Sequence, residues 1–233
     1  MIVSIHQPAY MPWLGYFDRI ARSDKFIYLD NVQFERNSFV NRNRIKTPTG
    51  PIWLTVPVRL EQHFNSTIAD IEVDARKNWQ RKHLRSIAQN YCRAPKFGVK
   101  FNQLAGFYER TVCSLADFCF SQLLFWVNEL SITTEILRAS TLPVDGHKSE
   151  LILNLCKHLG ATSYLSGPLG RNYLHVDEFT AAGIEVSYHD YVHPQYPQMH
   201  GDFIPAMGIV DYWMNCSEPM VFKQAARNLI NIP

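Results

Sequence analysis

The sequence of 233 residues predicts an α/β fold with a parallel sheet and a helical insertion. Two short apolar runs near the N-terminus, residues 2–5 and 26–29, are separated by one helical segment at about 13–21. Strands joined by a single helix usually pair in parallel, whereas antiparallel neighbours need only a tight turn. The alternation of helix and strand returns from residue 149, and helical patterns dominate about 75–130. We therefore expect a single α/β domain, 1–233, with a mainly helical subregion at about 75–130.

Polar residues follow both N-terminal strands at the point where each strand ends. His6 and Gln7 come after the first strand, and Pro12 stands just ahead of the first helix, where its missing N–H costs nothing. In parallel units, ligands bind beyond the carboxyl ends of the strands, near the start of the first helix. We therefore expect one crevice to be lined by the polar residues His6, Gln7, Asp30, Asn31 and Gln33.

A basic segment, residues 36–46, contains four cations against the single neighbouring acid Glu35. Residues 44–47 and 52–57 flank the Pro- and Gly-containing stretch 48–51, a pattern that predicts a β-hairpin. Asn41, Arg42 and Arg44 can form an anion clamp, because guanidinium groups meet a phosphate or carboxylate while amides orient it. The alternative is a solvated edge strand whose charges prevent aggregation.

The middle of the chain is predicted to be mainly helical. Residues 60–74 predict a loop and a short strand at 68–73, and helices are expected at about 76–91, 100–112 and 114–130. Trp79, His83 and Tyr91 fall on one arc of the first helix, so His83 is either a catalytic base or a buried core histidine. Eight basic residues and no acid lie between 75 and 100. This face is either simply solvated or meets phosphates, an anionic membrane or a tRNA.

The last third predicts strands at 132–137, 163–166 and 184–188, with a helix at 149–159 that Ser149 caps and Gly160 closes. A helical tail at about 207–229 is expected to cover the sheet. The loop after the strand at 163–166 can present backbone N–H groups to a phosphate, although many such loops are merely turns. Its candidate binding residues are Ser166, Gly167, Gly170, Arg171 and Tyr173.

Three histidines, His189, His193 and His200, lie within one Pro-rich stretch. We predict no metal site there, because no acidic or cysteine partner stands at a familiar spacing and the prolines exclude a His-bearing helix. Tyr191, Tyr196 and Gln198 suit a substrate-binding loop, since aromatic rings stack on sugars and amides hydrogen-bond to them. The alternative is a packed connection that proline makes rigid.

Composition points to an ordinary globular protein of a reducing cytoplasm. The net charge is only +2, and the five cysteines show no CxxC pair, so neither a disulfide framework nor a cysteine zinc site is indicated. No leader peptide is evident, and no apolar run approaches the roughly 18 residues of a membrane span. We expect any membrane contact to be peripheral. The oligomeric state is not indicated.

Long blocks of the chain resemble the WbqC-like family. They are HQPAYMPWLGYFDRIARSDKFIYLDNVQF, NRNRIKTPTGPIWLTVPV, YLSGPLGRNYL and YHDYVHPQYPQMHGDFIP, so the resemblance runs along the whole chain. It implies a role in bacterial surface polysaccharide biosynthesis, such as that of the O-antigen of lipopolysaccharide. It also favours the anion-clamp interpretation of residues 41–44 and the phosphate-loop interpretation of residues 166–173.

The opening of the chain is also similar to pantothenate synthetases and other nucleotidyltransferases of the HIGH type. The shared order is strand, Pro-containing loop, Gly, helix, Ser-Asp, strand and Asn-x-Gln-Phe, which implies a Rossmann-like, nucleotide-binding core. In those enzymes a His-x-Gly-His at the helix start grips the ATP phosphates. Here Trp13, Leu14, Gly15 and Tyr16 take these places, so the glycine is kept and both histidines are absent. This weighs against adenylylation.

These observations favour a transferase or amide-forming ligase that acts on an amino sugar, a sugar nucleotide or a glycan precursor. His6 is the candidate general base, and Asp30 is expected to orient it or to hold a substrate amine. Further substrate-binding candidates are Tyr10, Trp13 and Gly15. No nucleophile is evident, so direct transfer is favoured over a covalent intermediate.

The donor and the alternative function remain open from the sequence. The donor is an acyl-CoA thioester, an acyl-adenylate made in place from ATP, or an aminoacyl-tRNA. The alternative function is a non-catalytic nucleotide- or sugar-binding protein that assists a polysaccharide assembly complex.

Overall fold

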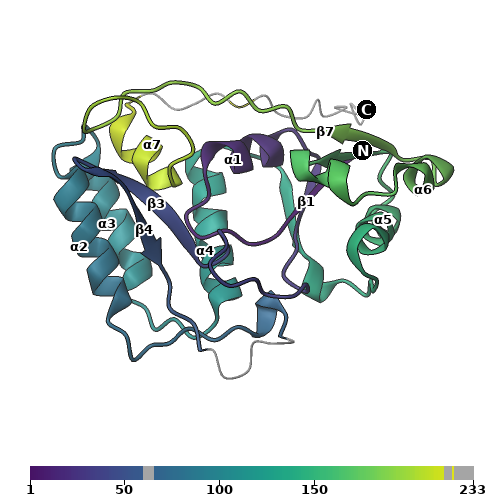
Figure 1. The fold of residues 1–233 in the computed structure, drawn as a ribbon, viewed down its shortest axis with the longest axis horizontal. Helices are drawn as coiled ribbons and strands as arrows, with labels where there is room; N and C mark the ends of the chain where they lie inside the picture. The colour runs from purple at the N-terminus through teal and green to yellow at the C-terminus, as the bar shows by residue number, and fades with distance from the viewer. Residues whose placement is uncertain (60–65, 218–221, 223–233) are drawn as a thin grey trace, which may run out of the picture.

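A computed structural model describes residues 1–59, 66–217 and 222, and it contains a five-stranded parallel sheet (Figure 1). The strands are β1 (Ile2–His6), β2 (Lys25–Tyr28), β5 (Glu135–Arg138), β6 (Ser163–Ser166) and β7 (Glu185–Tyr188), in the spatial order β5-β2-β1-β6-β7. The chain builds outward from β1 on one side and then returns to add β6 and β7 on the other. The predicted α/β fold with a Rossmann-like parallel sheet is confirmed, and its topological switch point lies between β1 and β6.

The register brings the ends of the central strands to one edge. His6 pairs with Tyr28 across β1 and β2, and Ser166 pairs with Tyr188 across β6 and β7. Side chains alternate between the two faces of the sheet. Val3 and Ile5 therefore point into one core, whereas His6 points to the opposite face.

Helices cover both faces of the sheet. On one face, α5 (Lys148–His158) and α6 (Val176–Ala181) form an apolar core with Val3, Ile5 and Ile27. On the other, α1 (Leu14–Ala21) and α4 (Leu115–Glu129) pack with Phe26 and Tyr28. All eight residues of α1 are buried, so this helix lies inside the molecule rather than on its surface.

The helical subregion contains α4 and, farther from the sheet at the left of Figure 1, α2 (Trp79–Tyr91) and α3 (Phe97–Tyr108). The short helix α7 (Ile209–Asn215) and the hairpin of β3 (Arg42–Thr47) and β4 (Gly50–Thr55) pack against it. A two-residue turn, Pro48 and Thr49, joins the hairpin strands. The predicted helices and hairpin are therefore present, with ends displaced by a few residues.

A long irregular segment crosses from the end of β7 to α7 over the edge of the molecule (Figure 1). We call it the strap, residues 189–208. It holds the three histidines of the Pro-rich stretch. Within the described part of the chain, no helix combines the length and the apolar character needed to cross a membrane.

Three local predictions are corrected or left outside the structure. The strand expected at 68–73 is wrong: Ile68–Asp70 is a short 3₁₀ helix, which Thr67 and Asp70 close with reciprocal capping hydrogen bonds. The Ser149 cap is also wrong, because its hydroxyl accepts from the His175 N–H at 2.9 Å and the helix begins at Lys148. The first part of the helical tail predicted at 207–229 is α7, which ends at Asn215. Residues 218–221 and 223–229 of that prediction lie outside the described residues.

Candidate functional site

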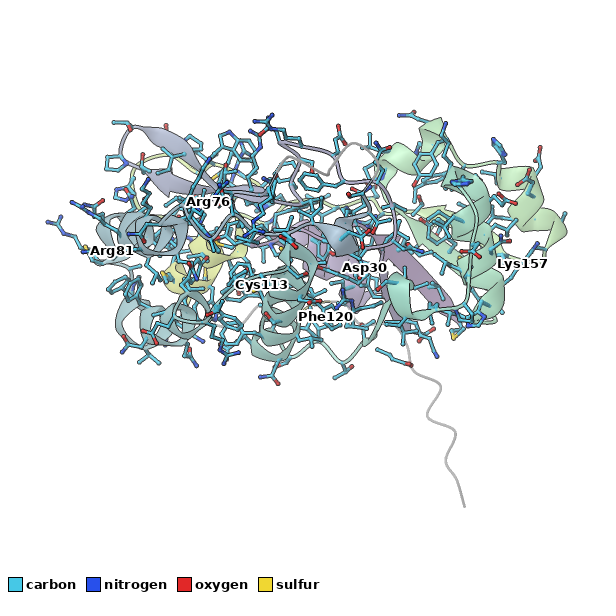
Figure 2. All side chains as sticks on the ribbon, turned by 90° about the horizontal axis from the view of Figure 1, so that it is seen from below. Asp30, Arg76, Arg81, Cys113, Phe120 and Lys157 are labelled. Carbon is cyan, nitrogen blue, oxygen red and sulfur yellow. The ribbon has the colours of Figure 1, made fainter. Side chains whose placement is uncertain are left out.

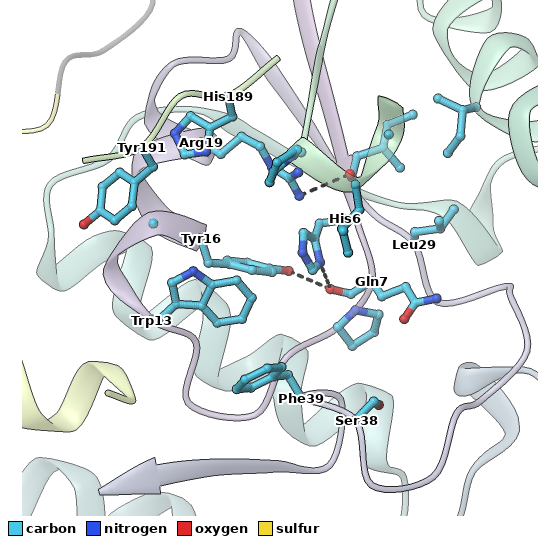
Figure 3. Close-up of a pocket in the computed structure, with 18 of the residues that line it drawn as sticks. His6, Gln7, Trp13, Tyr16, Arg19, Leu29, Ser38, Phe39, His189 and Tyr191 are labelled. Atoms are coloured by element: carbon cyan, nitrogen blue, oxygen red, sulfur yellow. Dashed lines mark hydrogen bonds between the residues drawn. The ribbon is translucent and has the colours of Figure 1, made fainter. Parts of the chain in front are cut away.

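A cavity of about 820 Å³ lies at the carboxyl edge of the sheet, around the switch point (Figure 3). Its walls include the residues that directly follow three strands: Gln7 after β1, Gly167 after β6 and His189 after β7. The first turn of α1 closes another side. Open parallel sheets bind their ligands at this position, so the cavity is the candidate functional site.

Aromatic rings form much of the cavity wall. His6 lies 4.8 Å from the ring of Tyr16 and 5.9 Å from that of Trp13, measured between ring centroids. Trp13 in turn lies 5.2 Å from Phe39, and Tyr173 and Tyr191 complete the aromatic set. Such rings stack on the flat faces of sugars and nucleobases, so the wall suits a ligand that carries a ring.

Arg19 is the buried cation of this cavity. Arg19 is only 5% exposed, and its Nη2 donates to the carbonyl of Ile5 at 3.3 Å. Of the residues that the structure describes, no carboxylate pairs with it. Burial lowers the pKa of Arg19, because the charged form is poorly solvated. A buried cation without a counter-charge is costly, and an anionic ligand in the cavity would compensate for it.

Gly167 is required for the position of Arg19. A Cβ atom at Gly167 would lie 2.5 Å from Arg19 Nη1. A carbon and a nitrogen atom that are not bonded do not approach this closely, so any side chain at position 167 would displace the guanidinium. The glycine predicted for a phosphate loop therefore serves here to let an arginine approach the loop.

His6 is neutral in this environment. Its Nδ1–H donates to the carbonyl of Gln7 at 2.8 Å, which leaves Nε2 as an acceptor. Burial, and secondly the charge of Arg19, lower the pKa of His6 to about 3. The imidazole is therefore a good hydrogen-bond acceptor for a substrate hydroxyl or amine, but a weak proton acceptor near neutral pH.

Gly15 accommodates the strap. A Cβ at Gly15 would lie 2.7 Å from Cδ1 of Tyr191, so the strap lies directly on the first turn of α1. HIGH-type enzymes keep a glycine at the matching position beside their ATP phosphates. In this chain the ring of Tyr191 occupies the space beside Gly15.

Eight of the residues predicted for the site line the cavity: His6, Gln7, Trp13, Gly15, Gly167, Gly170, Tyr173 and Tyr191. Asp30 does not contact His6. Its carboxylate accepts from Arg138 Nε and Ser140 Oγ at 2.8 and 2.9 Å, in the interior of the molecule (Figure 2). Three further candidates, Asn31, Gln33 and Ser166, are not among the lining residues.

His83 and Tyr10 lie in the core, away from the cavity lining. The two side chains are 2.9 Å apart between His83 Nδ1 and the Tyr10 hydroxyl, and Tyr10 also hydrogen-bonds to Tyr108. Burial lowers the pKa of His83 to about 4. This geometry matches the core-histidine interpretation of His83.

The predicted anion clamp lies on and just before the hairpin, and its residues are not among those that line the cavity. The guanidinium carbons of Arg42 and Arg44 lie 4.2 and 5.6 Å from the ring centroid of Trp53. Trp53 is 43% exposed and packs 5.7 Å from Phe39, which lines the cavity. Asn41 is buried and donates to the carbonyl of Val56. Arg171 lies over the ring of Tyr188.

Tyr196 and Gln198 hold the strap in place instead of lining the cavity. Both donate to Asp211, a fully buried carboxylate of α7 that also accepts from Tyr91. Gln198 in addition accepts from Lys46 Nζ. These polar contacts match the alternative of a packed connection.

Sequence reasoning missed the cavity residues Arg19 and His189, and Asp18 as the partner of His189. The pair of adjacent charged residues in an otherwise apolar helical run was the available signal for Asp18 and Arg19. Asp18 and His189 are 171 positions apart and form a hydrogen bond of 2.7 Å, which no local pattern shows. Within the described residues, no group of three or more His, Cys, Asp or Glu side chains is arranged to hold a metal ion.

Comparisons with known proteins agree with the length of the resemblance. A family model described as "WbqC-like protein family" matches residues 7–221. A relative in Mycobacterium tuberculosis (strain ATCC 25618 / H37Rv), "Uncharacterized protein Rv1507c", is 36% identical over 218 residues, covering 91% of this chain and 93% of that protein. No solved structure gives a significant match.

Proposed function

The chain belongs to the WbqC-like protein family, and from this premise we propose that it is an enzyme of bacterial surface polysaccharide biosynthesis. In this proposal it transfers an acyl or aminoacyl group to an amino sugar or a sugar nucleotide, or forms an amide on it. The cavity at the switch point is the active site. His6 and Gln7 bind the substrate there.

Arg19 carries this proposal. A sugar nucleotide combines rings with phosphate groups, and the cavity combines aromatic walls with one buried, uncompensated guanidinium. Arginine binds phosphate through paired N–H groups, and burial strengthens the attraction. The phosphate of the substrate therefore lies at Arg19, and its sugar ring lies against Trp13 or Tyr16.

Direct transfer from an activated donor fits the chemistry of the cavity wall. None of the residues that line it is a cysteine. Burial raises the pKa of Cys119 and Cys156, which makes both thiols poor nucleophiles. An amine or hydroxyl of the acceptor then attacks the donor without a covalent enzyme intermediate.

Ligand-induced stabilisation of the purified protein tests the anion site. Wild-type protein is heated with UDP-glucosamine, acetyl-CoA, ATP or inorganic pyrophosphate, and the same series is run with Arg19→Gln and with Arg85→Gln. A ligand present at about 100 times its Kd stabilises the fold by roughly 2.7 kcal/mol, which raises Tm measurably. We expect a shift in wild-type protein and Arg85→Gln, and none in Arg19→Gln.

The outcomes separate the donors. A shift with ATP supports an adenylate made in place, whereas a shift with UDP-glucosamine or acetyl-CoA supports direct transfer. An equal shift in Arg19→Gln and wild-type protein would contradict the proposal. Arg85 is a suitable control, because it is exposed on α2 and has no ion pair with a described residue.

A non-catalytic nucleotide- or sugar-binding protein is the second candidate. The position of Tyr191 favours it, because this ring lies on the first turn of α1, where nucleotidyltransferases hold phosphates. Ligand stabilisation that depends on Arg19, without product formation from any donor and acceptor pair, is the result that this candidate predicts.

A further inference from the structure

His189 is held firmly at the edge of the sheet. It directly follows β7, and its backbone N–H donates to the carbonyl of Ser166 at 2.8 Å. Its ring stacks on Tyr191, with centroids 5.6 Å apart and planes at 24°. The residue is 9% exposed, and it lines the cavity. Figure 3 shows His189 on the same side of the cavity as Arg19 and Tyr191.

Asp18 fixes the tautomer of this imidazole. Its carboxylate belongs to α1, is 7% exposed, and accepts from His189 Nε2–H at 2.7 Å. Arg22 forms an ion pair with the same carboxylate oxygen, also at 2.7 Å. Because the proton is on Nε2, the lone pair of the neutral ring is on Nδ1. Among the described residues, Nδ1 has no hydrogen-bond partner.

The two cavity histidines therefore differ in their partners. His6 donates to a neutral carbonyl and has a cation, Arg19, beside it, so protonation of its ring is opposed. His189 instead donates to the Asp18 carboxylate, which fixes the orientation and the tautomer of its ring. A carboxylate on one nitrogen and a free lone pair on the other are the features of a general base.

We propose that His189 and Asp18 are the proton-transfer dyad of the cavity, with His189 as the catalytic residue and Asp18 as its positioning residue. This inference rests on the proposed function, because it names the base of that transfer. It also moves the role of general base from His6 to His189, and leaves His6 as a hydrogen-bond acceptor for the substrate.

The proposed step balances in atoms, electrons and protons. The attacking amine or hydroxyl uses its lone pair to form a bond with the acyl carbon, and its proton passes to His189 Nδ1. The bond between that carbon and the leaving group breaks, and its electron pair stays on the leaving atom. The imidazolium then returns the proton to the leaving thiolate, phosphate or alkoxide. No oxidant, reductant or metal is needed.

Acylation with diethyl pyrocarbonate tests whether Nδ1 is an accessible, basic nitrogen. This reagent is attacked by neutral imidazole nitrogen, and mass spectrometry of peptides reports each histidine separately. His83 is the matched control, because it is 5% exposed and its Nδ1 is hydrogen-bonded to the Tyr10 hydroxyl. We expect His189 to react at least about tenfold faster than His83, since only a free lone pair is nucleophilic.

Variants of Asp18 test the positioning role. Removing a carboxylate behind a functional histidine typically costs about tenfold or more, so Asp18→Asn should slow the modification of His189 about tenfold. Asp18→Glu should restore part of the rate. Equal rates at His189 and His83 in wild-type protein would overturn the dyad, as would an unchanged rate in Asp18→Asn.

NMR of protein labelled with 15N-histidine supplies a readout that does not depend on any variant. We expect the proton of His189 on Nε2, and a proton found on Nδ1 would overturn the inference. Arg19→Gln separates the two proposals. An equal ligand-induced shift in Arg19→Gln and wild-type protein, with His189 still reactive, counts against the anion site alone. An unreactive His189 in a wild-type protein whose ligand binding depends on Arg19 counts against the dyad alone.

Discussion

His83 shows how burial sets the charge of a single residue. Its pKa is about 4 in the folded protein because its ring is desolvated in the core, and the ordinary value is 6.5. Between these two values the unfolded chain binds a proton at this histidine and the folded chain does not. The folded state therefore has its full stability above about pH 6.5 and loses stability as the pH falls toward 4.

Replacing this histidine should remove that part of the pH dependence. Each such group contributes a slope of up to about 1.4 kcal/mol per pH unit to the free energy of unfolding. The difference between wild-type protein and His83→Gln is therefore expected to shrink as the pH is lowered from 6.5 to 4.5. Urea unfolding at three pH values measures it. A constant difference across this range would show that the folded protein protonates His83 as readily as the unfolded chain does.

At this scale the sequence predicts residue types better than it predicts partners. His6 and Gln7 line the cavity, because the ends of parallel strands share one edge. Asp30 was expected beside His6, but Arg138, 108 positions away on β5, takes its carboxylate. Local patterns carry no information on such distant pairs, and the pair of Asp18 and His189 escaped prediction for the same reason.

The hairpin offers a second contact to a ligand that is long enough to extend out of the cavity. Its Arg42 is stacked on Trp53 and makes no side-chain hydrogen bond or ion pair with a described residue. A stacked guanidinium is oriented in advance while its N–H edge stays free. Phe39 connects this platform to the cavity. A ligand held at Arg19 and long enough to pass Phe39 would therefore place a second anionic group at Arg42.

Arg42→Gln should weaken the binding only of ligands that reach the hairpin. Loss of the contact between the half-buried Arg42 and a phosphate costs about tenfold in affinity for an extended ligand such as acetyl-CoA. Pyrophosphate, which is too short to leave the cavity, should bind as before. Titration calorimetry with Arg85→Gln as the matched control makes the comparison. Equal losses for both ligands, or for both variants, would indicate a general charge effect and not a second contact.

Elements with a regular pattern were predicted well from the sequence. The strand at 163–166 was placed exactly, and the left-handed Gly160 closes α5 as expected, with φ of +66°. The segment 68–73 failed because its apolar residues suggest a strand, whereas the reciprocal hydrogen bonds of Thr67 and Asp70 select a helical turn. The strap has no period at all, so its packing on α1 could not be foreseen.

The whole molecule is organised by one sheet that two apolar cores share. β2 contributes Phe26 and Tyr28 to the core with α1 and α4, and it contributes Ile27 to the core with α5, which Leu29, the residue directly after the strand, joins. Neither core can lose its packing without exposing the strands on which the other depends. This arrangement supports the proposal of a single domain, 1–233, in which the helical subregion is not a separate unit.

Calorimetry tests that proposal. We expect one unfolding transition whose calorimetric and van't Hoff enthalpies agree, as they do for a cooperative unit. A ligand of the cavity should move this whole transition upward, because it binds only the folded state. Two transitions, of which the ligand moves one, would instead assign the helical subregion to a domain of its own.

The central strand has a further consequence for the time at which the site appears. β1 is synthesised first, but its second neighbour, β6, follows about 160 positions later in the register Ile2 with Ser163. Until then one edge of β1 lacks its partner, and pairing over such distances is slow. The cavity needs residues from Ile5 to Tyr191. A nascent chain on the ribosome therefore acquires the complete cavity only after Tyr191 has emerged, and a chain terminated before β6 lacks one wall of it.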